Sequence, residues 1–275
     1  MSRGLGDVYK RQEIRRSKAE QFRFVRVRKA SLEQYPAAIC LKNLTLKFRQ
    51  RLNNIISGTA LRFPISCKGG TAMPSVCVHL MTACILKDRL DIINESDFYL
   101  GSIAPDAVNL NGFAEERVRY AAHLRSRDYN VWKQNIENYY NSISDRRSDF
   151  LKGFFLHLYT DIAWDEIIQP GLFDHLVASG YSDSELNGQK WKELSRFDLQ
   201  LRSDVRFKQI MKKLPKAQCR AVSSVSKAQL DNFRTLTVNA NESDKQGEAP
   251  HYLGFKAVAD TAELAYKYIK DLYDL

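Results

Sequence analysis

The sequence predicts an all-α fold, with a single multi-helix domain over residues 73–275. Three observations predict it. Apolar residues recur every three or four positions along several stretches, helix start and stop residues bound those stretches, and no stretch alternates apolar and polar residues as a half-buried strand does. The 203 residues of this range (275 − 72) are enough to bury one sizeable core.

The first expected helix begins after Ser75, whose side chain can accept a hydrogen bond from a free N–H group of the first turn, and runs to about Ile93. A loop-rich piece is expected over residues 95–119, because three helix-breaking residues interrupt it: Gly101, Pro105 and Gly112. A second long helix is expected to start at Asp128 or Asn130. A third covers residues 147–168 and is expected to stop where two breakers follow, Pro170 and Gly171.

The rest of the chain predicts further helices. Residues 171–180 form a short helix closed by Gly180, and residues 189–214 and 226–238 contribute two or three more. A strong apolar period over residues 252–275 predicts a C-terminal helix.

The charge of the chain is unevenly distributed. The net charge is +10, but residues 1–72 hold 16 Lys and Arg against 4 Asp and Glu, a net of +12. Residues 73–275 hold 26 basic and 28 acidic residues (42 − 16 and 32 − 4), a net of −2. A basic arm of this kind is typical of proteins that bind nucleic acid or membranes.

Two features indicate that the basic arm is an artefact. Residues 2–12, SRGLGDVYKRQ, match the translation of a widely used transposase sequencing adapter. Residues 68–70 can be encoded by a bacterial ribosome-binding sequence a suitable distance before Met73. We therefore expect translation of this bacterial, metagenomic gene to start at Met73, and residues 1–72 to be translated upstream DNA that is disordered or poorly folded. The alternative is a genuine basic arm.

Cysteine usage and hydropathy indicate the compartment. The five cysteines form no C-x-x-C pair, so neither a disulfide framework nor a zinc–thiolate site is indicated. No apolar run approaches the roughly 20 residues that span a bilayer. The stretch MPSVCVHLMTACIL, which starts at Met73, lacks the basic residues of a secretory signal. We expect a cytoplasmic protein, and no nucleic-acid partner because residues 73–275 carry no net positive charge.

A His–Asp pair lies in an apolar helix. His157 and Asp161 are four residues apart in GFFLHLYTDIAW, so both project from one face and can bind the same metal ion. Alone, such a pair also fits a local hydrogen bond or an exposed ion pair. The apolar neighbours indicate burial, and a buried ionised carboxylate needs a compensating partner. A metal ion would supply it.

Three more residues with metal-binding side chains lie in apolar surroundings. Asp106 follows Pro105 in GSIAPDAV, His123 lies in YAAHLR and His79 in SVCVHLMTA. The alternative for Asp106 is a helix N-cap or turn residue, and for each histidine a hydrogen-bonded core residue.

Taken in order, His79, Asp106, His123 and the pair His157-x-x-x-Asp161 resemble the zinc-dependent phospholipase C family. Its members are all-helical metal-dependent phosphodiesterases, in one superfamily with zinc-dependent single-strand nucleases. Besides the helix of His79, three stretches carry the resemblance, which covers about residues 73–175: FYLGSIAPDAVN, AAHLR and GFFLHLYTDIAWDEIIQP.

The resemblance implies a first metal held by Asp106, His123, His157 and Asp161, and a second metal held by His79, with Asp161 bridging the two. Such a ligand set suits Zn²⁺, while ligand type leaves Mn²⁺ and Fe²⁺ open. Asp106 and Asp161 would also be the catalytic residues, because a metal-bound carboxylate such as Asp106 can orient the attacking water.

The sequence departs from the secreted, three-metal members of this family. Ile167 stands where they have a histidine, and the later H-x-x-x-E is absent, so the third site is absent. The second is in doubt, because those members use a processed N-terminal Trp there. Asp165 and Glu166 fit either hydrogen-bond partners of the histidines or, as we favour, a solvated helix end. His175 and His251 are expected to lie outside the site.

The resemblance therefore implies a zinc-dependent hydrolase of phosphate esters, a phospholipase C-like phosphodiesterase that uses metal-activated water. The alternative is a non-catalytic helical domain with a structural metal. The partner would be a phosphoester substrate, with phospholipid as one candidate. The sequence leaves the oligomeric state open.

The start-site interpretation predicts a result in genomic DNA. Sequencing the locus from an intact source should show no adapter sequence, and a stop codon should close the reading frame upstream of residue 13. A reading frame that stays unbroken through residues 13–72, carries no adapter and continues upstream to its own start codon would contradict the interpretation and restore the basic arm.

Overall fold

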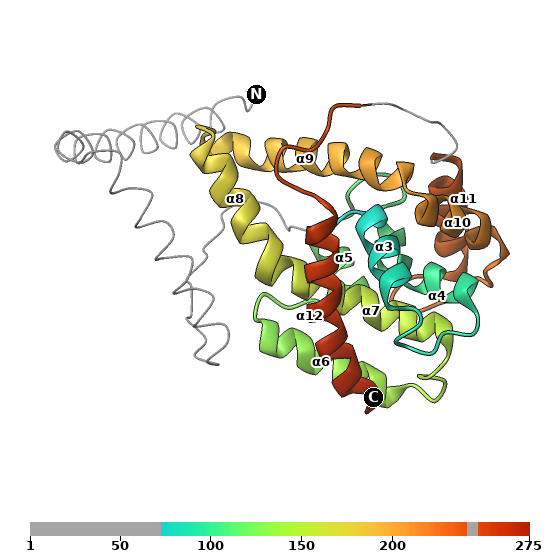
Figure 1. Cartoon of the computed structure of the whole chain (residues 1–275). Coiled ribbons are helices and arrows are strands. Elements are labelled where there is room, and N and C mark those ends of the chain that lie inside the picture. The colour runs from blue at the N-terminus through green and yellow to red at the C-terminus, as the bar shows by residue number, and fades with distance from the viewer. Residues whose placement is uncertain (1–72, 241–246) are drawn as a thin grey trace, which may run out of the picture. The chain divides into compact units, whose positions relative to one another are not determined.

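A computed structural model describes residues 73–240 and 247–275 of the chain. The adapter and basic-arm interpretations concern residues 1–72 and lie outside the described residues. Within the described ranges ten α-helices and three short helical turns follow one another (Figure 1), and the one β-bridge between described residues joins Val222 and Val225. The all-α prediction is confirmed.

In chain order the described helices are α3 (Val76–Leu86), α4 (Glu95–Gly101), α5 (Glu116–Ala122), α6 (Tyr129–Ser142), α7 (Asp149–Ala163), α8 (Gln169–Ala178), α9 (Asp183–Ser203), α10 (Val205–Lys213), α11 (Lys227–Ala240) and α12 (Phe255–Tyr273). The short turns are η1 (Ala104–Asn109), the π-helical η2 (Trp164–Ile168) and η3 (Leu214–Lys216).

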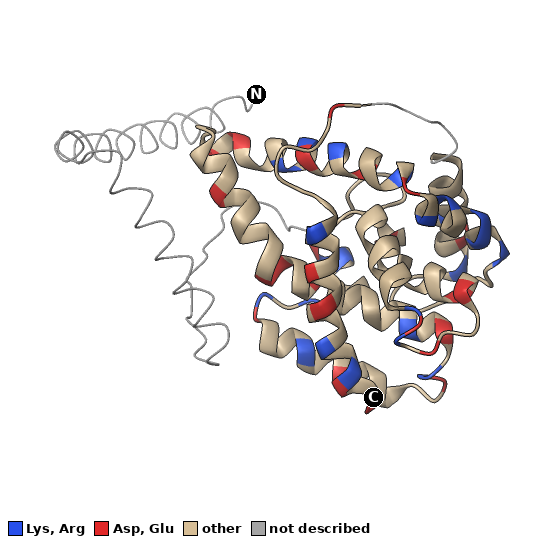
Figure 2. Ribbon diagram, in the orientation of Figure 1, with Lys and Arg blue, Asp and Glu red and all other residues tan. Residues whose placement is uncertain are grey.

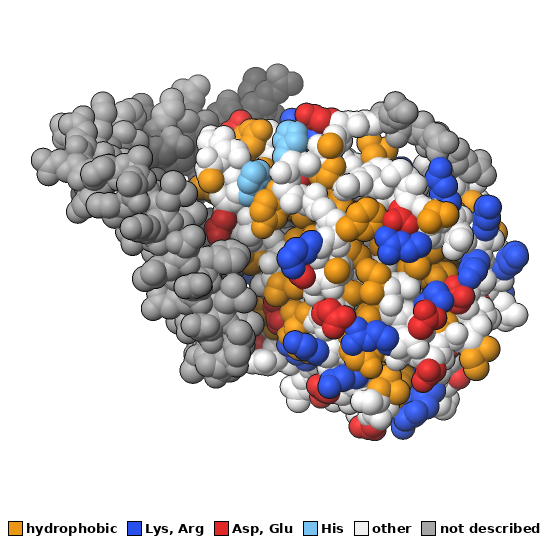
Figure 3. Space-filling view, in the orientation of Figure 1, with side chains coloured by type: hydrophobic (Ala, Val, Ile, Leu, Met, Phe, Trp, Pro, Cys, Tyr) orange, Lys and Arg blue, Asp and Glu red, His pale blue; other side chains and the backbone are white. Residues whose placement is uncertain are grey.

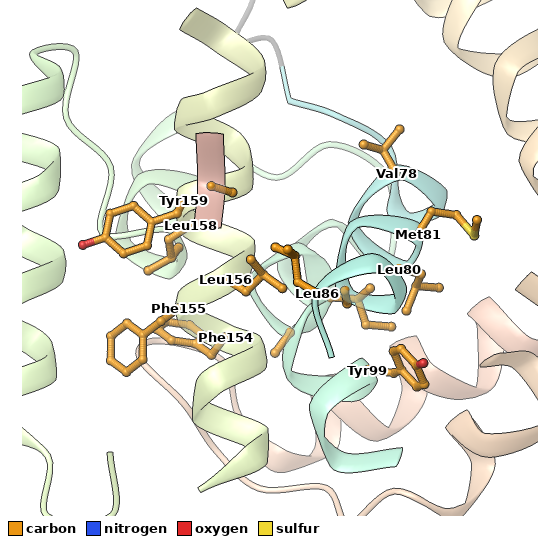
Figure 4. Close-up of a cluster of buried hydrophobic side chains, with 14 of the residues drawn as sticks. Val78, Leu80, Met81, Leu86, Tyr99, Phe154, Phe155, Leu156, Leu158 and Tyr159 are labelled. Carbon is orange, nitrogen blue, oxygen red and sulfur yellow. The ribbon is translucent and has the colours of Figure 1, made fainter. Parts of the chain in front are cut away.

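The helices α3 and α7 form the centre of the core, because both are apolar on almost every side. Eight of the eleven residues of α3 and thirteen of the fifteen residues of α7 are buried. A helix that is apolar all round must be covered on all sides; α12 packs on both of them, and α9 and α10 pack on α3. Figure 4 shows apolar side chains of α3, α4 and α7 meeting in this core.

Capping residues define where several helices begin, as expected. The Ser75 hydroxyl accepts a hydrogen bond from the N–H of Val78 at 3.3 Å and donates one to Asp198. Asp128 caps α6 by accepting from two N–H groups of its first turn. These caps replace hydrogen bonds that the first turn of a helix cannot make internally.

The first helix is shorter than expected. It ends at Leu86, and hydrogen-bonded turns continue to Asp91. Asp91 has a φ of 49°, in the left-handed region. Ile93, where the helix was expected to end, lies beyond the helix and is 94% exposed.

The expected loop over residues 95–119 is wrong, because this stretch contains α4, η1 and the start of α5. Gly101 is the last residue of α4, so a helix does end there. It also lies where α4 crosses α7. A Cβ atom on Gly101 would lie 1.9 Å from the Phe150 carbonyl oxygen, and one on Gly153 would lie 2.1 Å from the Phe98 carbonyl oxygen. The two glycines therefore let the backbones of α4 and α7 touch. Gly112, with φ 102°, is a true turn residue.

The expected helix end at Pro170 and Gly171 is also wrong, because α8 contains both. A proline ring in a regular α-helix clashes with the carbonyl four residues earlier, here that of Glu166. Glu166 lies in the π-helical turn η2, where the carbonyl of Trp164 accepts from Gln169, five residues ahead. The wider turn accommodates the ring, and the helix continues into α8.

Charged side chains of both signs are interspersed over the surface. Figure 2 shows Lys, Arg, Asp and Glu on most of the described helices, and the face in Figure 3 mixes both signs with apolar side chains. Among the described residues, no helix combines the length and the apolar character needed to cross a bilayer.

The close crossing predicts that Gly153→Ala destabilises the fold. Its Cβ would meet the α4 backbone, which a side-chain rotation cannot relieve, so we expect a loss of about 3 kcal/mol in the free energy of unfolding. Urea unfolding measures it. Gly188→Ala is the matched control: Gly188 is an exposed glycine in α9 with nothing within 4 Å of the new Cβ. It should be neutral or stabilise by up to about 1 kcal/mol. Equal stability of the two variants would contradict the crossing.

Candidate metal centre

The helix α7 supplies two of the five predicted ligands. His157 and Asp161 lie one turn apart on the same face, and both side chains are fully buried. The Nε2 atom of His157 is 3.7 Å from Oδ2 of Asp161. The exposed ion pair that the sequence left open is therefore excluded.

The end of α4 orients His157. Its Nδ1 lies 2.9 Å from the carbonyl oxygen of Ser102, the residue that follows the close glycine crossing. A carbonyl oxygen only accepts, so Nδ1 carries the proton and donates it. The lone pair of a neutral imidazole is then on Nε2, on the side of Asp161.

A helix end fixes His123 in the same way. His123 is the C-cap of α5, and its Nδ1 donates to the carbonyl of Arg119 at 2.8 Å. Leu124 follows with φ 50°, and the N–H of Arg125 bonds the Tyr120 carbonyl, which is the Schellman arrangement of a helix end. The indole N–H of Trp132 donates to the His123 carbonyl at 2.9 Å and holds the turn in place.

His79 of α3 lies on the other side of His157. Their rings stack with centroids 3.7 Å apart, and Nε2 of His79 is 3.3 Å from Oδ1 of Asp161. Neither ring nitrogen of His79 has a hydrogen-bond partner among the described residues. The alternative of a hydrogen-bonded core histidine therefore does not fit His79.

Asp106 completes the group. It lies in the first turn of η1, so the turn interpretation of this residue is correct as a description of the backbone. Its side chain is nevertheless almost buried, and Oδ1 lies 3.4 Å from Nε2 of His123 without a hydrogen-bond partner in the described part of the chain.

The arrangement leaves hydrogen-bond acceptors facing one another. Seven buried side-chain atoms of these five residues lack a hydrogen-bond partner among the residues described, including both oxygens of Asp161 and the Nε2 atoms of His123 and His157. Buried polar atoms are otherwise almost always satisfied. A carboxylate beside an imidazole lone pair is unfavourable unless a cation or a proton lies between them.

The pKa shifts of these residues reflect burial opposed by the charges of their neighbours. Burial alone would raise the pKa of Asp161, but the imidazoles of His157, His79 and His123 outweigh it and hold that pKa far below its usual range. The pKa of Asp106 is also lowered, since the imidazoles, His123 first, outweigh its burial. Burial, followed by the charge of His79, lowers the pKa of His157 to about 3. His157 is thus neutral near pH 7, and the two carboxylates are ionised when a positive charge lies beside them, on another imidazole or on a metal ion.

His123 differs from His157. Burial lowers its pKa, but Asp106 and Asp161 outweigh that effect and raise it. His123 therefore holds a proton more readily than His157, and a metal would displace that proton on binding.

The distances fit a transition-metal site. Two ligand atoms 2.0–2.1 Å from a tetrahedral Zn²⁺ ion are about 3.3–3.4 Å apart. The closest pairs here are 3.3, 3.4, 3.7 and 3.8 Å apart. Two groups of three bring one ligand atom each within 4.8 Å of one another: His79, His157 and Asp161, and Asp106, His123 and His157.

The structure thus brings together all five residues that the sequence singled out, from α3, η1, α5 and α7. Oδ1 of Asp161 is directed to His79, whereas Oδ2 is directed to His123 and His157. The two oxygens of this carboxylate therefore face different imidazoles. The buried His and Asp cluster could hold a metal; the identity and number of ions stay predictions.

The expectation of a solvated helix end is wrong for Asp165. Its side chain is buried in η2, and Oδ2 accepts a hydrogen bond from Arg125 at 2.6 Å. Glu166 is half-buried and contacts Lys133 at 3.3 Å. Sequence reasoning also missed Lys190 of α9, which is 1% exposed and is coupled electrostatically to Asp165. Burial raises the pKa of Asp165 to about 7 and lowers that of Lys190 to about 8.

The remaining histidines lie elsewhere. The ring of His175 packs on Tyr252 with centroids 5.0 Å apart, and Nε2 of His251 lies 3.1 Å from Glu248. A shallow surface hollow of about 370 Å³ runs along α9, and none of its lining residues is a predicted ligand: Gly188, Trp191, Lys192, Ser195, Arg196 and Glu248.

No protein-family model, curated protein or solved structure matches the chain. The resemblance to the zinc-dependent phospholipase C family therefore rests on the residues alone and stays a hypothesis.

The centre predicts that Asp161→Asn abolishes metal binding, since Asp161 contacts three of the four other ligands. Loss of an outer-shell partner alone lowers metal affinity about 10–100-fold, so loss of this ligand should lower it at least about 100-fold. Metal content by mass spectrometry after dialysis measures the effect. Asp88→Asn, at a side chain that is 84% exposed, is the control and should keep its metal. Unchanged metal content in Asp161→Asn would refute the centre.

Proposed function

We propose that the chain is a metal-dependent hydrolase of phosphate esters, with zinc as the expected metal. The observation that carries the proposal is the buried cluster of the five predicted ligands. Seven of their side-chain atoms have no hydrogen-bond partner among the described residues, and two groups of three offer ligand atoms within 4.8 Å of one another. Three histidines and two carboxylates are a ligand set that suits Zn²⁺. The resemblance of the same five residues to zinc-dependent phospholipases C supports phosphate esters as the substrate class.

When bound by these residues, a zinc ion would supply a water of lowered pKa and would withdraw charge from a phosphoryl oxygen. The protein positions the reactants. His123 and His157 are held by backbone carbonyls and cannot turn away, which keeps the ligand set preorganised. Phosphoryl transfer needs mainly positioning and charge neutralisation, so a rigid site of this kind is sufficient in principle.

Asp106 is the residue expected to handle the water. Its side chain is 8% exposed, whereas those of His79, His123, His157 and Asp161 are fully buried. Substrate and water therefore approach on the Asp106 side. A carboxylate there can orient the attacking water and accept its proton.

A non-catalytic structural metal is the second candidate, and the depth of burial favours it. Structural sites are closed by protein ligands, whereas catalytic sites keep one position open. Four fully buried ligands leave Asp106 as the main contact of the ligand set with solvent. The two candidates differ in turnover and not in metal binding.

The deciding experiment measures hydrolysis by the full chain. Bis(p-nitrophenyl) phosphate and a p-nitrophenyl ester of phosphocholine are supplied with and without chelator, and Zn²⁺ is then restored. We expect chelator-sensitive turnover, and a fall in kcat of at least about 100-fold in Asp106→Asn, with Asp88→Asn as the matched control. One tightly held metal ion with no turnover of either ester would contradict the proposal and support a structural metal.

A further inference from the structure

A cluster of charged side chains continues the metal centre along α7. Asp165 follows Asp161 by one turn, and Arg125 follows His123 by two residues. Arg125 donates to Oδ2 of Asp165 at 2.6 Å, and its guanidinium lies over the Trp132 ring, 4.6 Å from the centroid. The ligands and this charged pair are thus held by the same two segments.

Lys190 of α9 adds a second positive charge to the cluster. It is 1% exposed, and Nζ has no hydrogen-bond partner among the described residues; its contact is the Trp191 ring, 4.3 Å from Nζ to the centroid. The electrostatic neighbours of Lys190 are Asp165 and Arg125. Oδ1 of Asp165 is likewise buried without a hydrogen-bond partner among the described residues. A buried ammonium group and a buried carboxylate oxygen without such partners are unfavourable, so the cluster has hydrogen-bonding capacity for a further group.

The charge balance of the cluster favours an anion as this further group. In their charged forms, Arg125 and Lys190 carry two positive charges and Asp165 carries one negative charge. One positive charge is then in excess. The two carboxylates of the metal centre are balanced by one divalent cation. A phosphodiester carries one negative charge, so it would neutralise the excess and satisfy the Nζ donors.

We propose that Lys190, supported by the Arg125–Asp165 pair, binds the phosphoryl oxygen of a phosphate ester beside the metal centre. The proposal rests on the proposed function for the choice of phosphate among anions. Arg125 is a positioning residue for Asp165, and Lys190 is the residue that contacts the ligand. The competing arrangement is a direct ion pair between Lys190 and Asp165, which needs no ligand.

The test is calorimetric titration of the full chain with inorganic phosphate, with and without bound Zn²⁺. Lys190→Met should raise the Kd for phosphate at least about tenfold, because a charge-assisted hydrogen bond is lost. Lys190→Arg should retain most of the affinity. Lys192→Met, an exposed position of the same helix, is the matched control and should bind as the unmodified chain does. Metal content should be equal in all four proteins.

Phosphate binding by Lys190→Met with unchanged Kd would overturn the proposal, as would absence of phosphate binding to the unmodified chain. If Lys190→Met does not fold, the unmodified chain labelled with ¹⁵N at lysine Nζ decides. The Lys190 resonance is assigned as the one that is missing from the spectrum of Lys190→Arg. Phosphate should shift this resonance, and an unshifted resonance overturns the proposal. These readouts do not need turnover, so a chain that binds phosphate through Lys190 and hydrolyses no ester contradicts the proposed function alone.

Discussion

The close crossing of α4 and α7 is the contact on which the candidate site depends. Gly101 and Gly153 let the two backbones touch, and Ser102 and His157 follow them on the two helices. Only at this separation does the Ser102 carbonyl reach Nδ1 of His157 at 2.9 Å. That hydrogen bond decides which nitrogen carries the proton, and thereby leaves the Nε2 lone pair for a cation. A packing constraint in the core thus sets the chemistry of a ligand.

The electrostatics of the centre then link metal binding to the fold. Asp161 is surrounded by three imidazoles in a fully buried position, and its ligand partners come from α3, α5 and α7. A cation held between them would relieve the repulsion of facing acceptors and would join elements that are distant in sequence. The free energy of binding is in that case also free energy of folding, as in other buried metal sites.

Local spacing predicted one pair of the candidate site, and the resemblance to a family singled out His79, Asp106 and His123, whereas other long-range contacts were missed. The pair His157 and Asp161 was readable because four residues make one helical turn in an apolar helix. Gly101 was predicted as a helix breaker, and α4 does end there. Its second role, which is to let the α7 backbone approach, depends on the partner helix and could not be predicted from the local sequence. Asp165 was misread because Arg125, which keeps it buried, lies forty residues earlier.

Lys190 bears on the choice between the two candidate functions. It lies in a polar stretch of α9, KWKEL, where nothing local predicts burial. A structural metal site gains nothing from a buried ammonium group nearby, because like charges repel and desolvating the ammonium is costly. Lys190 is coupled to Asp165, which is in turn coupled to Asp161. If the proposed anion binds at Lys190, the two candidates are separated, because a hydrolase of phosphate esters needs such a contact and a structural site does not. If Lys190 instead pairs directly with Asp165, its burial is compatible with both candidates.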